Sequence, residues 1–113
     1  MPLVSIIIPY YKKNFFISRC LKSIQVQSYT NYEIILIYDD NNIDDLVYIK
    51  ESFSKNSKIK IVQNKKNYGA GMSRNIGIKY SSGRFVAFLD ADDIWYSDKL
   101  EKQVKFMKEN KYD

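Results

Sequence analysis

The sequence has no histidine, and Cys20 is its single cysteine. These absences exclude Ser-His-Asp triads, Cys-His pairs, an internal disulfide and zinc sites built from cysteine and histidine. Long hydrophobic runs are also lacking, because no apolar stretch approaches the ~20 residues that span a bilayer. The first residues carry no basic segment before their apolar run, so we expect no signal peptide and a cytoplasmic location. Any chemistry then rests on carboxylates, amides, hydroxyls and cations.

Two nucleotide-binding fingerprints are missing as well. No Gly-x-Gly-x-x-Gly follows the first apolar run, and no Gly-x-x-x-x-Gly-Lys-Ser/Thr occurs anywhere, which argues against a dinucleotide fingerprint and a P-loop. The net charge of +5 suits nucleic acid, anionic lipid or a phosphorylated small molecule without choosing among them. Lysine-rich pieces such as Lys65-Lys66 are most simply solvated, so we do not expect a nucleic-acid partner.

What the sequence does contain is an alternation of two hydrophobic patterns in 113 residues, of which 45% are hydrophobic. Buried strands are expected at residues 4–8, 34–38, 59–62 and 85–89. Helices are expected from a cap at Asn14 through Ile24, over 44–53, along a face of Met72, Ile76 and Tyr80, and over 97–111. The alternation predicts an α/β fold: a Rossmann-like, doubly wound, mostly parallel sheet of about four strands flanked by helices, in one domain over residues 1–113.

The expected strands end in aromatic and acidic residues. The first is followed by Pro9-Tyr10-Tyr11, the second by Asp39-Asp40-Asn41-Asn42 and the fourth by Asp90-Ala91-Asp92-Asp93. Since the carboxyl ends of parallel strands meet at one edge of a sheet, we expect these residues to share a crevice. A phosphoacceptor receiver domain also places acids at strand ends, but its acidic pair would follow the first strand, where this chain has two tyrosines.

Three carboxylates lie within four residues at Asp90, Asp92 and Asp93. They repel one another at neutral pH unless a cation neutralises them. A divalent ion is the simplest such cation, because Mg²⁺ and Mn²⁺ prefer oxygen ligands and bind through one or two carboxylates together with substrate phosphates. The Asp-x-Asp spacing is common in proteins, and a solvated turn whose acids cap a helix is the alternative interpretation.

Four stretches of the chain carry a resemblance to a known family. They are VSIIIPYY (4–11), NYEIILIYDD (31–40), NYGAGMSRNIGI (67–78) and GRFVAFLDADDIW (83–95). In order and spacing they resemble the motifs of the nucleotide-binding, N-terminal half of the family 2 inverting GT-A glycosyltransferases. The resemblance implies metal-dependent transfer of a sugar from a nucleotide-sugar, most often a UDP-sugar, to an acceptor hydroxyl, as in bacterial surface polysaccharide synthesis.

The resemblance also implies roles for individual residues. Asp39 would hydrogen-bond the base, and Tyr11 or Tyr10 would pack on it. Asp90 and Asp92 would meet the ribose and the metal-bound diphosphate, with Asp92 as the direct ligand of Mn²⁺ or Mg²⁺. Arg74 would face the diphosphate or, on an equal footing, form a salt bridge with the acidic cluster. The expected nucleotide-sugar-binding residues are Pro9, Tyr10, Tyr11, Asp39, Arg74, Asp90, Ala91 and Asp92.

The catalytic base is not assigned by these motifs. Family members use a second half to bind the acceptor and to supply the base, so we expect both, with a saccharide or lipid-linked acceptor and peripheral membrane contact, from beyond Asp113. Asp93 is the alternative base. At the second strand, Tyr38 and Asp40 depart from the family's usual acid and glycine, which predicts a differently shaped loop. Other interpretations are a nucleotide-sugar-binding or scaffold module without turnover, and a basic nucleic-acid-binding domain.

Overall fold

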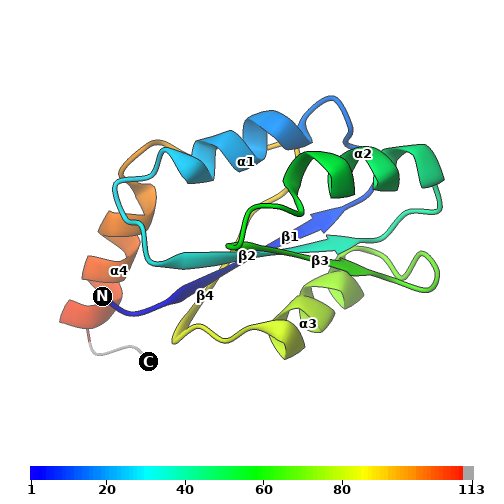
Figure 1. Ribbon diagram of the computed structural model, residues 1–113. Helices are drawn as coiled ribbons and strands as arrows, with labels where there is room; N and C mark the ends of the chain where they lie inside the picture. The colour runs from blue at the N-terminus through cyan, green and yellow to red at the C-terminus, as the bar shows by residue number, and fades with distance from the viewer. Residues whose placement is uncertain (111–113) are drawn as a thin grey trace.

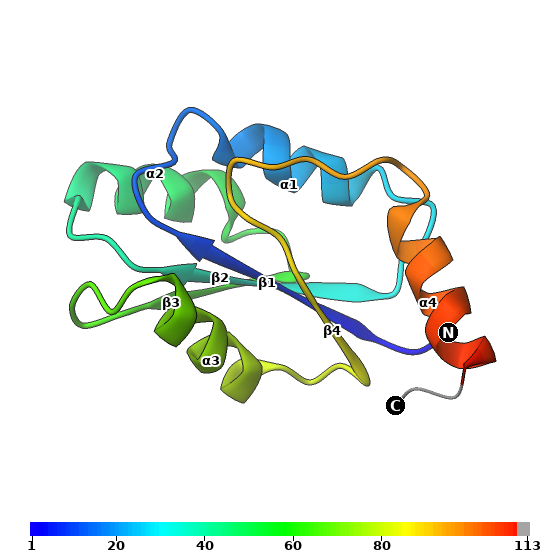
Figure 2. The same cartoon turned by 180° about the vertical axis from the view of Figure 1, so that it is seen from behind.

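Four parallel strands form the central sheet, in the spatial order β3-β2-β1-β4. The computed structural model describes residues 1–110, with strands β1 (Val4–Tyr10), β2 (Tyr32–Tyr38), β3 (Ile59–Gln63) and β4 (Phe85–Phe88). The helices between and after them are α1 (Ile17–Gln25), α2 (Ile43–Phe53), α3 (Ala70–Tyr80) and α4 (Lys99–Glu109). Figure 1 and the reverse view in Figure 2 show α1 and α2 on one face of the sheet and α3 on the other. The predicted doubly wound α/β architecture is confirmed.

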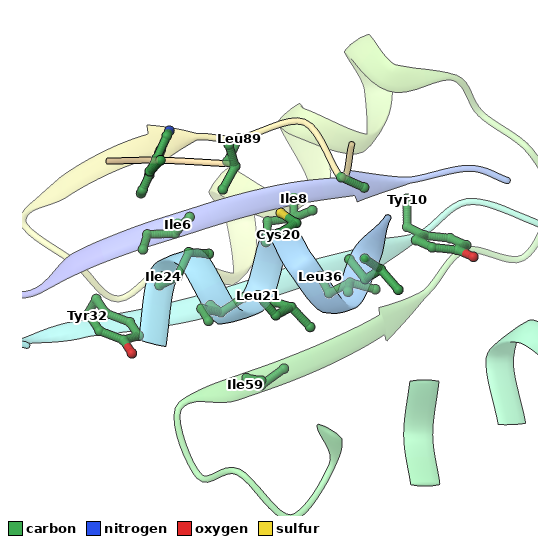
Figure 3. Packing of buried hydrophobic residues seen from close by; sticks show 14 of the residues in the cluster. Ile6, Ile8, Tyr10, Cys20, Leu21, Ile24, Tyr32, Leu36, Ile59 and Leu89 are labelled. Carbon is green, nitrogen blue, oxygen red and sulfur yellow. The ribbon is translucent and has the colours of Figure 1, made fainter. Parts of the chain in front are cut away.

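The two central strands are apolar on both faces because helices cover both. On one face, residues of β1 and β2 pack against α1 (Figure 3); these buried residues include Ile6, Ile8, Leu36, Cys20, Leu21 and Ile24. On the other face a smaller cluster lies toward α3, formed by Ile7, Ile35 and Ile37 with the partly buried Ile76. A continuous apolar run is therefore what a strand in this place needs.

The start of α1 differs from the prediction. Asn14 lies in the turn before the helix, the N-cap is Phe16, and no side chain caps the helix. Instead, the carbonyl oxygen of Lys13 accepts hydrogen bonds from the amides of Phe16 and Ile17 at 2.9 and 3.0 Å. A backbone carbonyl thus orders the entry to α1 in place of the expected asparagine cap.

Two small residues, joined by Ile76 from the predicted apolar face, pack α3 on the sheet. Ser73 and Gly77 are its buried residues, whereas Met72 and Tyr80 are about half exposed. A Cβ added at Gly77 would lie 2.4 Å from Cγ2 of Ile7, so the helix sits closer to β1 than an alanine would permit. The spacing of Met72 and Tyr80 is helical, but their side of the helix faces outward.

The sheet order reverses at β1, because the chain adds β2 and β3 on one side of it and β4 on the other. In a doubly wound sheet such a reversal opens a crevice at the carboxyl ends of the two strands concerned. The strands begin and end within two residues of their predicted bounds, and the predicted end of the last helix, residue 111, lies outside the described residues. Within residues 1–110 no helix has the length and apolar character needed to cross a membrane.

Candidate functional site

A cavity of about 690 Å³ lies at the carboxyl ends of the strands, where the sheet order reverses. Its walls are Pro9, Tyr10, Tyr11, Lys12 and Lys13 from β1 and the loop after it, Asp39 after β2, Asn67, Gly69, Ala70 and Arg74 around the start of α3, and Asp90, Ala91 and Asp92 after β4. All eight residues expected to bind the nucleotide-sugar thus line one cavity. Asp93, the alternative base, is absent from its lining.

The two tyrosines at the end of β1 lie in different environments. Tyr10 is fully buried, its ring stacks on Tyr38 with centroids 5.1 Å apart, and its hydroxyl donates to Asp45 at 3.2 Å. Burial, and then the Asp45 carboxylate, raise the pKa of Tyr10 above its ordinary value. Tyr11 is 44% exposed. Of the two rings, the geometry therefore favours Tyr11 as the surface for a planar ligand.

Asp39 is almost fully buried and holds the loop that precedes α3. Its Oδ1 accepts from Nδ2 of Asn64 at 2.9 Å and from the amide of Tyr68 at 2.7 Å, and its Oδ2 accepts from the amide of Gly69 at 2.8 Å. Gly69 has φ of +89°, a left-handed conformation that favours glycine. Since a carboxylate offers about four acceptor positions, these bonds leave one on Oδ2 for a ligand.

The carboxylates of Asp90, Asp92 and Asp93 offer oxygens that all lie within 4.8 Å of one another. Their backbone is anchored by the buried Leu89 and Ala91. A hydrogen bond of 2.9 Å from the amide of Asp93 to the carbonyl of Asp90 closes the turn. Oxygen ligands gathered in this way fit the preference of Mg²⁺ and Mn²⁺. The turn after β4, anchored by these two buried residues, therefore presents three carboxylates that suit a divalent cation.

The single cysteine is buried beside this turn. Its Sγ donates to the carbonyl oxygen of Asp90 at 3.6 Å. Burial, reinforced by the neighbouring acids, raises the pKa of Cys20 to about 12. Because the thiolate is the reactive form, a thiol held protonated is inert at neutral pH.

Two cations neutralise part of the acidic cluster. Nζ of Lys13 lies 3.3 Å from Oδ2 of Asp92, and Nη2 of Arg74 lies 3.3 Å from Oδ1 of Asp90. Of the two alternatives predicted for Arg74, the salt bridge is present, while its place in the cavity wall also suits a phosphate contact. The pairs are partly exposed, so each contributes little to stability and exchanges readily.

Lys12, Lys13 and Asp40 are parts of this region to which the sequence motifs gave no role. Asp40 is buried, and its carboxylate accepts from the amides of Lys12, Asn41 and Asn42 at 3.0, 2.7 and 3.2 Å. Lys12 has φ of 52°, a left-handed conformation that a lysine adopts when its surroundings impose it. The sequence did contain a sign of this part of the site, because Lys12 and Lys13 follow the first strand at the edge of the sheet where the acids are expected.

Comparison with known proteins identifies the family. Residues 5–113 match Glycosyl transferase family 2. The chain belongs to this family. The resemblance carried by the four motifs is thereby confirmed, and the related proteins are glycosyltransferases.

One similar sequence and two similar solved structures show how much of each protein this chain spans. It is 44% identical over 108 residues to the Escherichia coli UDP-Glc:alpha-D-GlcNAc-diphosphoundecaprenol beta-1,3-glucosyltransferase WfgD, covering 96% of this chain and 42% of the enzyme. Residues 1–349 of Staphylococcus aureus TarS, solved with UDP-GlcNAc, match with a TM-score of 0.83 and 28% identity, over 94% of this chain and 31% of that one. The mannosyltransferase PcManGT of Pyrobaculum calidifontis shares the fold, with a TM-score of 0.85 and 22% identity over 94% of this chain and 32% of that one. The chain spans less than half the length of each.

Proposed function

We propose that this chain is the donor-binding part of a metal-dependent, inverting glycosyltransferase that uses a UDP-sugar in bacterial surface polysaccharide synthesis. The observation that carries the proposal is the cavity at the reversal of the sheet, which gathers Asp39, the exposed Tyr11 and the Asp90–Asp92 turn. The related WfgD is named for UDP-Glc, and TarS was solved with UDP-GlcNAc, which supports a uridine donor.

At the base end of the cavity, Tyr11 and Asp39 supply two complementary contacts. The Tyr11 ring covers one face of the uracil, an interaction of about 1–3 kcal/mol for a base on an aromatic side chain. The free acceptor position on Oδ2 of Asp39 takes the imide N–H of uracil, because a carboxylate is a strong acceptor for such a donor. Fixed by three hydrogen bonds, the carboxylate is already oriented before the donor arrives.

At the diphosphate end, Asp92 and Asp90 would hold Mn²⁺ or Mg²⁺, and Arg74 would contact the phosphate oxygens. The ion, when bound, neutralises charge on the departing diphosphate. Pro9 and Ala91 complete the cavity wall between these groups. An acceptor hydroxyl attacks the anomeric carbon in line, so the configuration at that carbon inverts. Electrostatic stabilisation of the leaving group is the part of catalysis that these residues supply.

The acceptor site and the general base are proposed to lie in the rest of the full-length protein. WfgD is named for an acceptor carried on diphosphoundecaprenol, and the chain spans 42% of that enzyme. The acceptor would be a saccharide or a lipid-linked sugar, and a lipid-linked one would bring the full protein to the cytoplasmic face of a membrane. Asp93 remains the alternative base within the described residues. Its carboxylate oxygen lies within 4.8 Å of those of Asp90 and Asp92, although Asp93 does not itself line the cavity.

The test is the thermal midpoint of the chain with UDP, ADP or GDP in the presence of Mn²⁺. A ligand at a hundred times its dissociation constant adds about 2.7 kcal/mol to the free energy of unfolding, so UDP should raise the midpoint clearly and the purine nucleotides less. Equal shifts with all three nucleotides would contradict uracil recognition by Asp39.

The metal role is tested by Asp92→Asn, with Glu51→Gln as a matched control on the exposed side of α2. We expect Asp92→Asn to lose the Mn²⁺-dependent shift with UDP while the midpoint without ligand is unchanged or higher, since one of three mutually repelling charges is gone. Glu51→Gln should behave as the parent. If Asp92→Asn binds UDP with Mn²⁺ as tightly as the parent, the direct ligand is Asp90 or Asp93.

A further inference from the structure

Lys13 is the one cavity-lining lysine in the described residues that is ion-paired with the acidic cluster. Its Nζ lies 3.3 Å from Oδ2 of Asp92, the carboxylate proposed above as the direct metal ligand. Lys13 comes from the loop before α1, whereas Arg74, which pairs with Asp90, comes from α3. The two cations therefore reach the cluster from different elements of the fold, one carboxylate each.

The backbone around Lys13 is held on both sides. The amide of the preceding Lys12 donates to Oδ2 of Asp40 at 3.0 Å, in the left-handed conformation with φ of 52°. The carbonyl of Lys13 itself accepts from the amides of Phe16 and Ile17. Because the backbone of Lys13 is already ordered, little further conformational entropy is lost when its side chain binds a ligand in the cavity. The flexible side chain can then contact either Asp92 or another anion nearby.

The charges at the site explain why the anion bound by Lys13 should change from Asp92 to a diphosphate. Three carboxylates opposed by Lys13 and Arg74 leave one net negative charge, which repels a diphosphate. A divalent cation on the carboxylates reverses that sign and also competes with Lys13 for Asp92. The ion pair is partly exposed, at 39% for Lys13 and 43% for Asp92, so it contributes on the order of 0–1 kcal/mol and is easily given up.

We propose that Lys13 is a second diphosphate-binding residue, which holds Asp92 when the donor is absent and turns to the donor's phosphate oxygens when Asp92 binds the metal. The inference rests on the proposed function, because it requires a diphosphate in this cavity. The loop between β1 and α1 would then supply one phosphate contact through Lys13, and α3 would supply the other through Arg74. The ligand class is a nucleoside diphosphate or its sugar ester.

The experiment compares Lys13→Gln with the parent, with the conservative Lys13→Arg and with Lys22→Gln, an exposed lysine of α1 outside the cavity. For each 113-residue protein, calorimetry measures the dissociation constants of UDP and of uridine with Mn²⁺ present, and Mn²⁺ alone is titrated separately. We expect Lys13→Gln to weaken UDP binding about tenfold, the size of one lost charged hydrogen bond. Uridine, which has no phosphate, should bind unchanged, and Mn²⁺ alone should bind equally or more tightly because a competing cation is gone.

The outcomes separate the two proposals. If the parent fails to bind UDP, the proposed function falls and this inference with it. If the parent binds UDP and Lys13→Gln binds it as well as Lys22→Gln does, the proposed function stands and the role of Lys13 is wrong. A parallel loss of UDP, uridine and Mn²⁺ would show a structural role and would also overturn the inference. Recovery of UDP affinity in Lys13→Arg supports a phosphate contact made by the charge.

Discussion

Glu33 is a buried carboxylate near the amino end of β2, at the opposite end of the sheet from the cavity. The Ser5 hydroxyl and the Ser82 amide donate to its Oε2 at 2.6 and 2.7 Å, and Nζ of Lys60 lies 3.2 Å from its Oε1. Burial acts to raise the pKa of Glu33, but these donors outweigh burial, and the pKa lies below its ordinary value. The ionised form therefore stabilises the fold by joining β1, β2, β3 and the loop before β4.

We predict that Glu33→Gln lowers stability at neutral pH by about 1–3 kcal/mol, because charged hydrogen bonds are replaced by weaker ones. Because the pKa of Glu33 is lowered on folding, the ionised carboxylate adds its full share to the free energy of unfolding at pH values above about 4.3, the ordinary pKa of glutamate. That share is lost as the pH falls through the lower pKa of the folded state. Denaturant unfolding of parent and variant at several pH values measures the difference in free energy of unfolding. This difference between parent and variant should become smaller below a pH of about 4. A difference that does not change with pH would show that ionised Glu33 does not stabilise the fold.

At the same scale, the sequence predicted some of the residues that line the cavity and missed others. Asp39 and Asp92 could be predicted to share the cavity because the carboxyl ends of parallel strands meet at one edge. The choice between Tyr10 and Tyr11 needed the structure, which shows that β1 extends to Tyr10 and places that ring in the same core cluster as Ile6 and Ile8. The pairing of Lys13 with Asp92 needed it too, because it joins two loops distant in sequence, and only the folded chain brings them together.

Among the helices, α3 shows how packing can escape a hydrophobic pattern. Its spacing of apolar residues predicted one face, while the buried contacts are made by Ser73 and Gly77, whose small size lets the helix approach β1. Absence of a side chain leaves no apolar signal in the sequence. The position of Arg74 in the cavity follows from that close approach, since Arg74 lies on the same helix, between the two small residues.

We therefore predict that Gly77→Ala destabilises the chain by about 1–3 kcal/mol, because its Cβ would lie 2.4 Å from Ile7 and the helix would have to move. The same movement should shift Arg74 and weaken UDP binding. Thermal unfolding and UDP calorimetry measure the two effects.

The matched control is Gly71→Ala in the same helix, where an added Cβ would meet nothing within 4 Å. Its expected effect has the opposite sign, a stabilisation of about 0.4–1 kcal/mol from reduced freedom of the unfolded chain. Equal effects of the two substitutions would mean that helix propensity, and not contact with Ile7, governs both positions.

For the whole molecule, the alternation of strands and helices predicted the fold, but it could not supply the strand order. The order depends on which strands pair across the sheet, and it decides that the cavity opens between β1 and β4. Local patterns predicted residues that would gather at one edge. The reversal of the sheet at β1 explains why they enclose a cavity there instead of spreading along a flat rim.

If the proposed function holds, this arrangement would bind a donor without a residue assigned to activate an acceptor. Of the four acids considered for donor, metal or proton binding, Asp39 holds the loop before α3, while Asp90 and Asp92 are paired with cations and proposed as metal ligands. Asp93, the third carboxylate of the cluster, is the one left as a candidate base. We predict that the 113-residue chain binds UDP-sugars but forms no glycosylated product, with at most slow hydrolysis of the donor.

The measurement is released UDP and glycosylated product after incubation with a panel of UDP-sugars, Mn²⁺ and candidate saccharide and lipid-linked acceptors. The full-length protein, assayed in parallel, should form product, and a full-length protein that binds UDP without transfer would instead indicate a scaffold. Acceptor-dependent product from the 113 residues on the order of 1 per second or faster would be ordinary enzymatic turnover and would contradict the prediction. In that event Asp93→Asn should abolish transfer while leaving UDP affinity unchanged, because a general base acts on the acceptor and is not needed to hold the donor.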